Sequence, residues 1–303
     1  MNENIFAIVG PTASGKSDLA LDLAQKLNSV ILSVDSLAVY KEIDIASAKP
    51  SREELELVKH FGVDELLPNE KFSVIEFLEH FQKAKTYAKE RDKGLIIVGG
   101  TSFYLKVLSQ GISDLPKIEP AIKKEVQKIM ADTNSAYGLL KSIDLEYANN
   151  IASNDRYRIE KALEIYKATS MPPSQYFKAN LPKPIVPNLP IYEIAIEREV
   201  LRKRIALRTS KMLNMGLIDE VAALEHKYTR APQSMGAIGI KEVLDFFDGI
   251  YSKQELKEKI ATNTARLAKR QVTFNKSQLD IKFSGSVKEI KALLCSHQKD
   301  AYL

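Results

Sequence analysis

The chain has 303 residues, of which 45% are hydrophobic and 27% are charged, and its formal net charge is +5 at neutral pH. This composition predicts a globular protein with one large domain or two unequal ones, and it excludes a disordered or fibrous chain. The single cysteine, Cys295, excludes a disulfide framework and a cysteine-based structural zinc site. The basic charge permits a polyanionic partner without requiring one.

The start of the chain, MNENIFAIVG, lacks the basic stretch and cleavage site of a secretory leader. No apolar run approaches the length that a membrane span needs. We therefore expect a cytoplasmic protein with no membrane partner.

The first part of the chain alternates between strand-like and helical patterns. Short apolar, β-prone runs predict strands at residues 4–10, 29–34 and 94–100. Apolar residues at helical spacing predict helices at residues 17–27 and 73–94. This alternation predicts a mostly parallel sheet that is covered by helices on both faces.

The pattern changes in the middle of the chain. Residues 115–187 contain no strand-like run, only helical stretches such as EPAIKKEVQKIM and NDRYRIEKALEIYKAT, and they end in the proline-dense NLPKPIVPNLP. Strand character returns at residues 191–197, and long helical segments follow. We predict a core domain of residues 1–114 and 188–303 with an inserted all-helical domain of residues 115–187.

The segment GPTASGKS matches the phosphate-binding loop (P-loop) motif in full, and it lies between a predicted strand and a predicted helix. The fold prediction is therefore α/β, a P-loop parallel sheet core covered by helices. Backbone amides and the helix N-terminus would bind phosphate oxygens, Lys16 would add a positive charge, and the Ser17 hydroxyl would reach a magnesium ion. The motif is typical of nucleoside triphosphatases and small-molecule kinases, but a diphosphate leaving group fits it equally well. The candidate phosphate-binding residues are Gly10, Pro11, Thr12, Ala13, Ser14, Gly15, Lys16 and Ser17.

The segment SVDSLAVY places a carboxylate at the end of the second predicted strand. Asp35 there is a candidate magnesium ligand, a candidate catalytic base or a capping residue. The third predicted strand ends in VGGTSFYL, where Gly99 and Gly100 let the backbone approach a ligand and Thr101 opens a helix.

The late segment TARLAKRQVTFNK carries several cations and no acidic residue. Arg266, Lys269 and Arg270 share one helix face, which is typical either of a solvated surface or of a contact with a phosphate backbone.

Five of these segments together resemble one family. GPTASGKS, SVDSLAVYKEIDIASAKP, VGGTSFYLKVLSQGI, NDRYRIEKALEIY and ARLAKRQVTF occur in the order and at roughly the spacing of bacterial tRNA dimethylallyltransferases, the IPP transferase family, from residue 5 to about residue 280. The resemblance implies transfer of a dimethylallyl group from dimethylallyl diphosphate to N6 of adenosine 37 in tRNA. It further implies a Mg²⁺ cofactor. Apart from the resemblance, we expect the protein to be a monomer.

The resemblance also implies roles for single residues. Asp35 would be the base that takes a proton from the weakly nucleophilic adenine amine. Thr101 would lie beside the flipped nucleotide and the reacting centre. Lys16 and the loop amides would neutralise the departing diphosphate together with magnesium bound by Ser17. Arg204 and Arg208, four residues apart on one helix face, match family arginines that stabilise the diphosphate.

The tRNA contacts expected from the resemblance come from three segments. Asp35, Thr101 and their neighbours would line the wall against the flipped adenosine, the inserted domain would contact the anticodon stem-loop, and the late basic helix would follow the RNA backbone. The residues are Asp35, Ser36, Leu37, Ala38, Thr101, Lys123, Tyr157, Arg158, Ile159, Glu160, Lys161, Arg266, Lys269 and Arg270.

Three positions depart from the family pattern. Phe274 and Lys276 stand where family members often have tryptophan and arginine, and Ile240 stands where they usually have tyrosine. The alternatives that we keep are a prenyltransferase acting on free adenine nucleotides, a P-loop small-molecule kinase, and a non-catalytic RNA-binding module.

Overall fold

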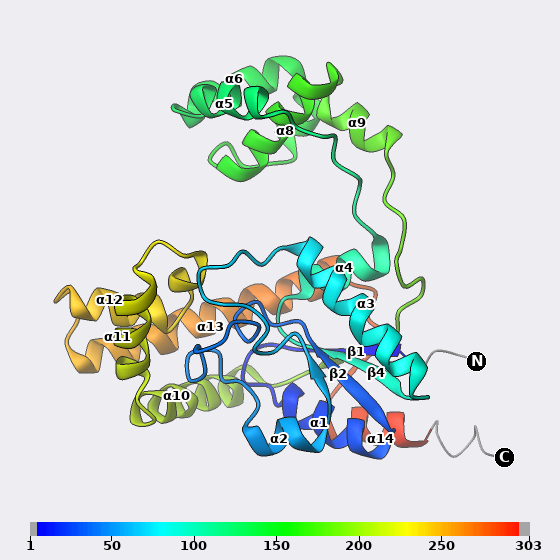
Figure 1. The fold of residues 1–303 in the computed structure, drawn as a ribbon, viewed down its shortest axis with the longest axis vertical. Coiled ribbons are helices and arrows are strands. Elements are labelled where there is room, and N and C mark those ends of the chain that lie inside the picture. The colour runs from blue at the N-terminus through cyan, green and yellow to red at the C-terminus, as the bar shows by residue number, and fades with distance from the viewer. Residues whose placement is uncertain (1–4, 297–303) are drawn as a thin grey trace. The chain divides into compact units, whose positions relative to one another are not determined.

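The computed structural model describes residues 5–296. Residues 1–4, which belong to the segment considered for a secretory leader, and residues 297–303 lie outside the described residues. The chain divides into two compact units (Figure 1). We call Met1–Ser109 with Asn188–Leu303 the core unit, and Gln110–Pro187 the inserted unit. Among the described residues, no helix has the length and apolar character needed to cross a membrane.

The core unit is built on a six-stranded sheet in the order β3-β2-β4-β1-β5-β6, with every strand pair parallel. The α/β fold predicted from the sequence is confirmed. The central strands are apolar along their whole length because helices cover both faces. The strands are β1 (Ile5–Val9), β2 (Ser29–Ser33), β3 (His60–Phe61), β4 (Gly94–Val98), β5 (Ile191–Ile194) and β6 (Phe283–Gly285).

Helices α1 and α14 lie on one side of the sheet and α3 and α4 on the other (Figure 1). Leu19 and Leu23 of α1 and Ile290 of α14 belong to one apolar cluster with Ile8 and Ile96 of the sheet. The helices of this unit are α1 (Lys16–Lys26), α2 (Arg52–Leu57), α3 (Val74–Glu90), α4 (Ser102–Gln110), α10 (Arg198–Asn214), α11 (Leu217–Tyr228), the 3₁₀-helix η1 (Gln233–Gly236), α12 (Ile240–Phe247), α13 (Lys253–Gln278) and α14 (Val287–Ser296).

Local signals decide where several of these helices begin. Ser73 and Glu76 form a capping box at the start of α3, and Ser252 and Glu255 form another at the start of α13. Gly216, at φ 99°, separates α10 from α11 within the long helical segment. Glycine suits this position because a left-handed conformation costs it no steric clash.

The inserted unit is entirely helical over its regular elements and has a core of its own. Its apolar cluster includes Val126, Met130, Leu140, Ile159 and Leu163, all of them buried. The helices are α5 (Pro120–Ile129), α6 (Thr133–Ile143), α7 (Leu145–Asn149), α8 (Arg156–Thr169) and α9 (Pro173–Ala179).

The sequence patterns missed two strands, and the four strands that they predicted all end before their predicted last residue, β1 and β2 by one residue and β4 and β5 by two and three. β3 and β6 have two and three residues, too few for a period-two pattern. β4 ends at Val98. At the next residue, Gly99, the backbone passes so close to the backbone of Val34 that an added Cβ would lie 2.6 Å from it. β5 ends at Ile194.

Candidate active site

Three loops meet at the carboxyl edge of the sheet. They follow β1, β4 and β2, which are neighbours and run parallel, so the ends of these strands lie side by side. The loops enclose a pocket of about 170 Å³. Its lining residues include Thr12, Lys16, Ser17, Ser33, Asp35, Ala38, Ser47, Ala48, Lys49, Pro50, Gly99 and Arg208.

The loop after β1 folds back on itself to open α1. The amide of Ser14 donates to the carbonyl of Pro11 at 3.1 Å, and the Lys16 ammonium donates to the same carbonyl at 3.5 Å. Gly15 stands immediately before the helix at φ 92°, where a side chain would strain the backbone. This geometry is that of a phosphate-binding loop in front of a helix N-terminus.

Burial controls the charge of Lys16. The pKa of Lys16 is lowered to about 8, mainly by desolvation and to a smaller extent by the charge of Arg208, while the negative charge of Asp35 acts in the opposite direction. The loss of water therefore outweighs the attraction of the carboxylate. An incoming polyanion would supply the negative charge that the free site lacks.

Both arginines reach the phosphate loop from α10. Arg204 donates to the carbonyl of Ser14 at 3.1 Å, and Arg208 donates to the hydroxyl of Thr12 at 3.4 Å. Arg208 lines the pocket, and burial lowers its pKa. Arg204 is exposed and does not line this pocket.

The carboxylate of Asp35 uses only one oxygen within the protein. Its Oδ1 accepts from the amides of Leu37 at 2.9 Å and Ala38 at 3.4 Å, as in an Asx turn. Among the described residues, Oδ2 has no hydrogen-bond partner. One carboxylate can therefore hold the loop and still accept a proton.

Thr101 connects the second glycine loop to the Asp35 loop. Its hydroxyl accepts from the amide of Ser36 at 3.3 Å, and its own amide donates to the carbonyl of Val34 at 3.0 Å. The hydroxyl proton of Thr101 remains available to a ligand. α4 begins at the next residue, and the backbone carbonyl of Thr101 accepts from Tyr104.

Gln271 of α13 is a site residue that the sequence did not single out. Its Oε1 accepts from the amide of Thr12 at 2.9 Å, and its Nε2 donates to the carbonyl of Gly100 at 3.0 Å. One side chain thus joins the phosphate loop to the second glycine loop. The only signal was its place in the AKRQ segment, which says nothing about a partner 259 residues away.

A larger cavity of about 860 Å³ lies against the phosphate loop at Pro11. Its walls are mostly apolar and come from the end of β5, from α10 and from α13, with Arg266 and Lys269 at the lining as well. Besides Pro11, the apolar lining residues are Ile194, Ala195, Ile196, Leu201, Ile205, Ala261, Ala265, Ala268 and Val272.

The predicted RNA contacts of the core unit are exposed to different degrees. Arg266, Lys269 and Arg270 are exposed on α13, and Ser36 is exposed after β2. Ala38 is buried in the pocket wall, and Leu37 is half-buried.

In the inserted unit, the predicted contacts lie on α8 and α5. Tyr157 is 70% exposed and Arg158 is exposed beside Asp155, with which it forms an ion pair at 2.9 Å. Ile159 is fully buried in the unit's core, so the prediction that its side chain contacts RNA is wrong. Three predicted RNA contacts of this unit remain. Glu160 is half-buried, and Lys161 forms an ion pair with Glu164. Lys123 is exposed on α5.

The three departures from the family pattern occupy different environments. Ile240 is fully buried in the apolar cluster of α10 to α13, so an apolar side chain suits its position. Phe274 is half-buried, and Lys276 is exposed near the end of α13.

The family model for IPP transferase matches residues 38–278. A tRNA dimethylallyltransferase of Nautilia profundicola is 57% identical, over 97% of this chain and 100% of its own. The tRNA isopentenylpyrophosphate transferase of Bacillus halodurans, a solved structure, has a TM-score of 0.72 and 31% identity, over 99% of this chain and 98% of its own. A eukaryotic dimethylallyltransferase acting on tRNA has a TM-score of 0.80 and 27% identity, over 92% of this chain and 73% of its own. Because these similarities extend over nearly the whole chain, it belongs to the IPP transferase family.

Proposed function

We propose that this protein transfers a dimethylallyl group from dimethylallyl diphosphate to N6 of adenosine 37 in tRNA and releases diphosphate. The observation that carries the proposal is that Asp35 lines one pocket with Lys16 and Ser17 of the phosphate loop. A base and a diphosphate site side by side suit a displacement at an allylic carbon. Family membership and the relatives named tRNA dimethylallyltransferase select this reaction among those that a phosphate loop can serve. Acting on tRNA, the enzyme would work in the cytoplasm.

Asp35 is the base in this mechanism. An exocyclic adenine amine is a poor nucleophile because its lone pair is delocalised into the ring, so a positioned carboxylate assists its attack. The bond from N6 to the allylic carbon forms, the bond from that carbon to the diphosphate oxygen breaks, and the N6 proton passes to Asp35 Oδ2. The Thr101 hydroxyl, bonded to the Ser36 amide, orients the nucleoside beside that oxygen.

The cations of the pocket stabilise the leaving group. Lys16, Arg208 and the amides of the phosphate loop neutralise negative charge that grows on the departing diphosphate. Arg204, bonded to the carbonyl of Ser14, approaches the diphosphate from the outer side of the loop.

The pocket also suits a magnesium ion. Its oxygen donors include the Ser17 hydroxyl and the Asp35 carboxylate, and hard oxygen ligands are those that magnesium prefers. Over residues 5–296, no three histidine, cysteine or acidic side chains are placed to hold a metal by themselves. Ser17 and the diphosphate would therefore hold the ion, as is common for magnesium at phosphate sites. When bound, it would withdraw charge from the leaving group.

The dimethylallyl group would occupy the 860 Å³ cavity beside the phosphate loop. Aliphatic side chains of β5, α10 and α13 form most of its walls, and burial of the prenyl methyl groups against them is favourable. The cavity reaches the loop at Pro11, so the two halves of the donor would lie in adjacent sites.

The acceptor would be held by exposed cations on both units. Arg266, Lys269 and Arg270 on α13, and Lys123 and Arg158 on the inserted unit, offer charge to RNA phosphates. Tyr157, with its ring exposed, could stack on an unpaired base.

The test is an incubation of the protein and magnesium with dimethylallyl diphosphate labelled in the prenyl group, with unmodified tRNA in one reaction and AMP, ADP or ATP in another. We expect label in tRNA alone. Label only in free nucleotide would agree with the proposed roles of Asp35 and the phosphate loop, and it would contradict the proposed RNA contacts. Label in neither, with phosphate transfer from ATP instead, would favour a kinase.

A further inference from the structure

The loop after Asp35, residues 36–50, touches the pocket at both ends and leaves it in the middle. Ala38 lines the pocket near the start of the loop, and Ser47, Ala48 and Lys49 line it near the end. The conformation of residues 43–46, between these ends, therefore determines where the second half of the pocket wall lies.

Hydrogen bonds within this loop, such as those from the amides of Ala48 and Lys49 to the carbonyls of Ile45 and Asp44, supply only part of its support. Glu42 and Ala48 adopt left-handed backbone conformations, at φ 64° and φ 49°. Residues other than glycine keep such conformations only where surrounding structure enforces them. A support outside the loop is required.

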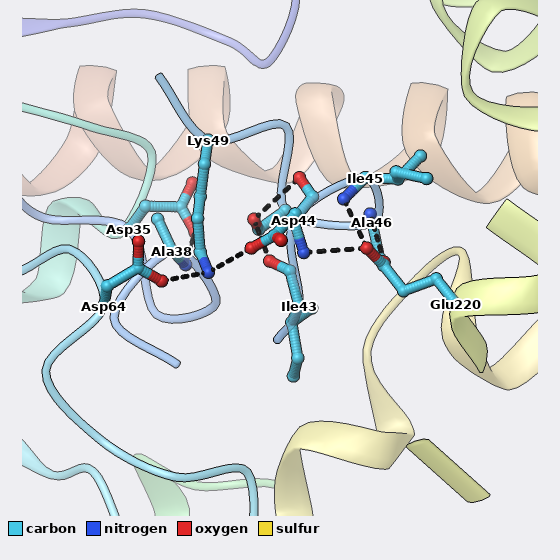
Figure 2. Close-up of polar contacts among 10 residues, drawn as sticks. Asp35, Ala38, Ile43, Asp44, Ile45, Ala46, Lys49, Asp64 and Glu220 are labelled. Atoms are coloured by element: carbon cyan, nitrogen blue, oxygen red, sulfur yellow. Dashed lines mark hydrogen bonds and ion pairs between the residues drawn. The ribbon is translucent and has the colours of Figure 1, made fainter. Parts of the chain in front are cut away.

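Glu220 of α11 provides it. Its Oε2 accepts from the amides of Asp44 at 2.8 Å and Ile45 at 2.7 Å, and its Oε1 accepts from the amide of Ala46 at 2.9 Å (Figure 2). A single carboxylate thus satisfies three consecutive backbone donors. Among described side chains no other acceptor is bonded to these three amides.

The helix that carries Glu220 is itself fixed to the loop. Leu217, Val221 and Leu224 of α11 share a buried apolar cluster with Ile43 and Ala46. The carboxylate therefore projects from a rigid element, as a support for backbone geometry requires.

The support reaches the pocket through Lys49. Its ammonium donates to Asp44 at 2.7 Å and also to Asp64, and its side chain is only 4% exposed (Figure 2). Asp44 is one of the residues whose amide Glu220 holds. Asp44 and Asp64 together thus hold Lys49 in the pocket wall, and Glu220 acts on the first of these two partners.

We infer that Glu220 is a positioning residue for the transfer reaction. It fixes residues 44–46, and through them it places Ser47, Ala48 and Lys49 against the substrate site. Glu220 does not itself line the pocket. The inference rests on the proposed function, because turnover in that reaction is its measure.

The test compares E220Q with D219N in the prenyl-transfer assay on the full chain. Glutamine has the shape of glutamate, but in either orientation its NH₂ group faces at least one backbone N–H, and two donors repel. Asp219 is exposed in the same helix turn, and it has no hydrogen bond or ion pair among the described residues, so D219N removes the same charge without touching the loop.

We expect E220Q to lower kcat roughly tenfold to a hundredfold, because a small misplacement at a reacting centre has effects of that size. The KM for tRNA should stay within about twofold to threefold of wild type, and hydrogen exchange at the amides of residues 44–46 should accelerate. E220D, which keeps both acceptor oxygens on a shorter side chain, should recover part of the lost turnover.

Two results would overturn the inference. One is a kcat for E220Q equal to that of D219N, and the other is unchanged exchange at residues 44–46. If E220Q does not fold, E220D is compared with D219N in its place, and an equal kcat there has the same meaning. Failure of the wild-type protein to transfer prenyl groups would instead contradict the proposed function, and the exchange measurement would still report whether Glu220 holds the loop.

Discussion

Asp35 combines two tasks on its two carboxylate oxygens. Oδ1 accepts from the amides of Leu37 and Ala38, which shapes the start of the loop. Oδ2, which makes no hydrogen bond within the described residues, is the atom that we propose as the base. In place of a helix cap, Asp35 forms a turn, and this turn is compatible with a role as the base, so a substitution can separate the two tasks.

D35N should remove catalysis and keep the turn. The amide Oδ1 of asparagine can still accept from Leu37, but a carboxamide does not accept the proton, so turnover should fall about a hundredfold or more. Binding of tRNA, measured by filter retention, should stay near wild type. D35A should lose turnover equally and also lose about 1 kcal/mol of stability with the hydrogen bonds of the turn. Wild-type turnover in D35N would show that Asp35 is not the base.

The lowered pKa of Lys16 predicts a pH dependence of diphosphate binding. Only the protonated amine of Lys16 attracts the anion, and bound diphosphate keeps this amine protonated. Above the pKa of Lys16 in the free protein, about 8, diphosphate binding therefore requires the uptake of a proton. Affinity for inorganic diphosphate, measured by calorimetry, should then fall by up to roughly tenfold per pH unit above that value.

K16R is the matched control for this pH dependence. Arginine stays charged throughout the range, so the ratio of wild-type to K16R affinity removes the ionisation of the ligand itself. A ratio that does not change with pH would contradict the lowered pKa.

At the scale of elements, α13 joins two loops that lie far apart in sequence. Q271A would break both hydrogen bonds between the phosphate loop and the second glycine loop, so kcat/KM for the prenyl donor should fall about tenfold. S277A is the control, because the Ser277 hydroxyl bonds only within its own helix, where it donates to the carbonyl of Phe274 and accepts from the side-chain amide of Gln278. Equal steady-state parameters for Q271A and S277A would show that the bridge has no role in turnover.

The apolar cavity gives a second prediction at this scale. A265L would fill part of the space between α13 and α10, where Ala265 packs near Leu201 and Ile205. The KM for dimethylallyl diphosphate should rise about tenfold, because extra methylene groups in a packed space cost about 1–3 kcal/mol. The affinity for tRNA should stay constant. A292L is the control, because Ala292 is exposed on α14 and does not line the cavity. An unchanged donor KM would place the prenyl group elsewhere.

For the whole molecule, the distribution of exposed cations predicts how RNA binding depends on salt. R270Q and K123Q, one from each unit, should each reduce the slope of log affinity against log salt concentration by about 1 if each cation meets one phosphate. K288Q on α14, which also removes one exposed charge, should leave the slope unchanged. If all variants had the same slope as the wild type, the proposal that these two surfaces contact RNA phosphates would be wrong.

The sequence alone determined those features whose physics is local. The phosphate loop needs only contiguous residues between a strand and a helix, and Asp35 needs only its place at a strand end. The helical periodicity of residues 115–187 likewise predicted an all-helical segment, because amphipathic spacing is a local pattern.

Only the tertiary structure decided the contacts that bring distant segments together. Packing of α13 placed Gln271 between two loops, packing of α11 placed Glu220 under three amides, and packing of α8 turned Ile159 into the core. No local pattern encodes such partners, because a helix face can be buried or solvated without a change in its spacing. The residue types of the site could thus be read from the chain, while its supports follow from how the helices pack.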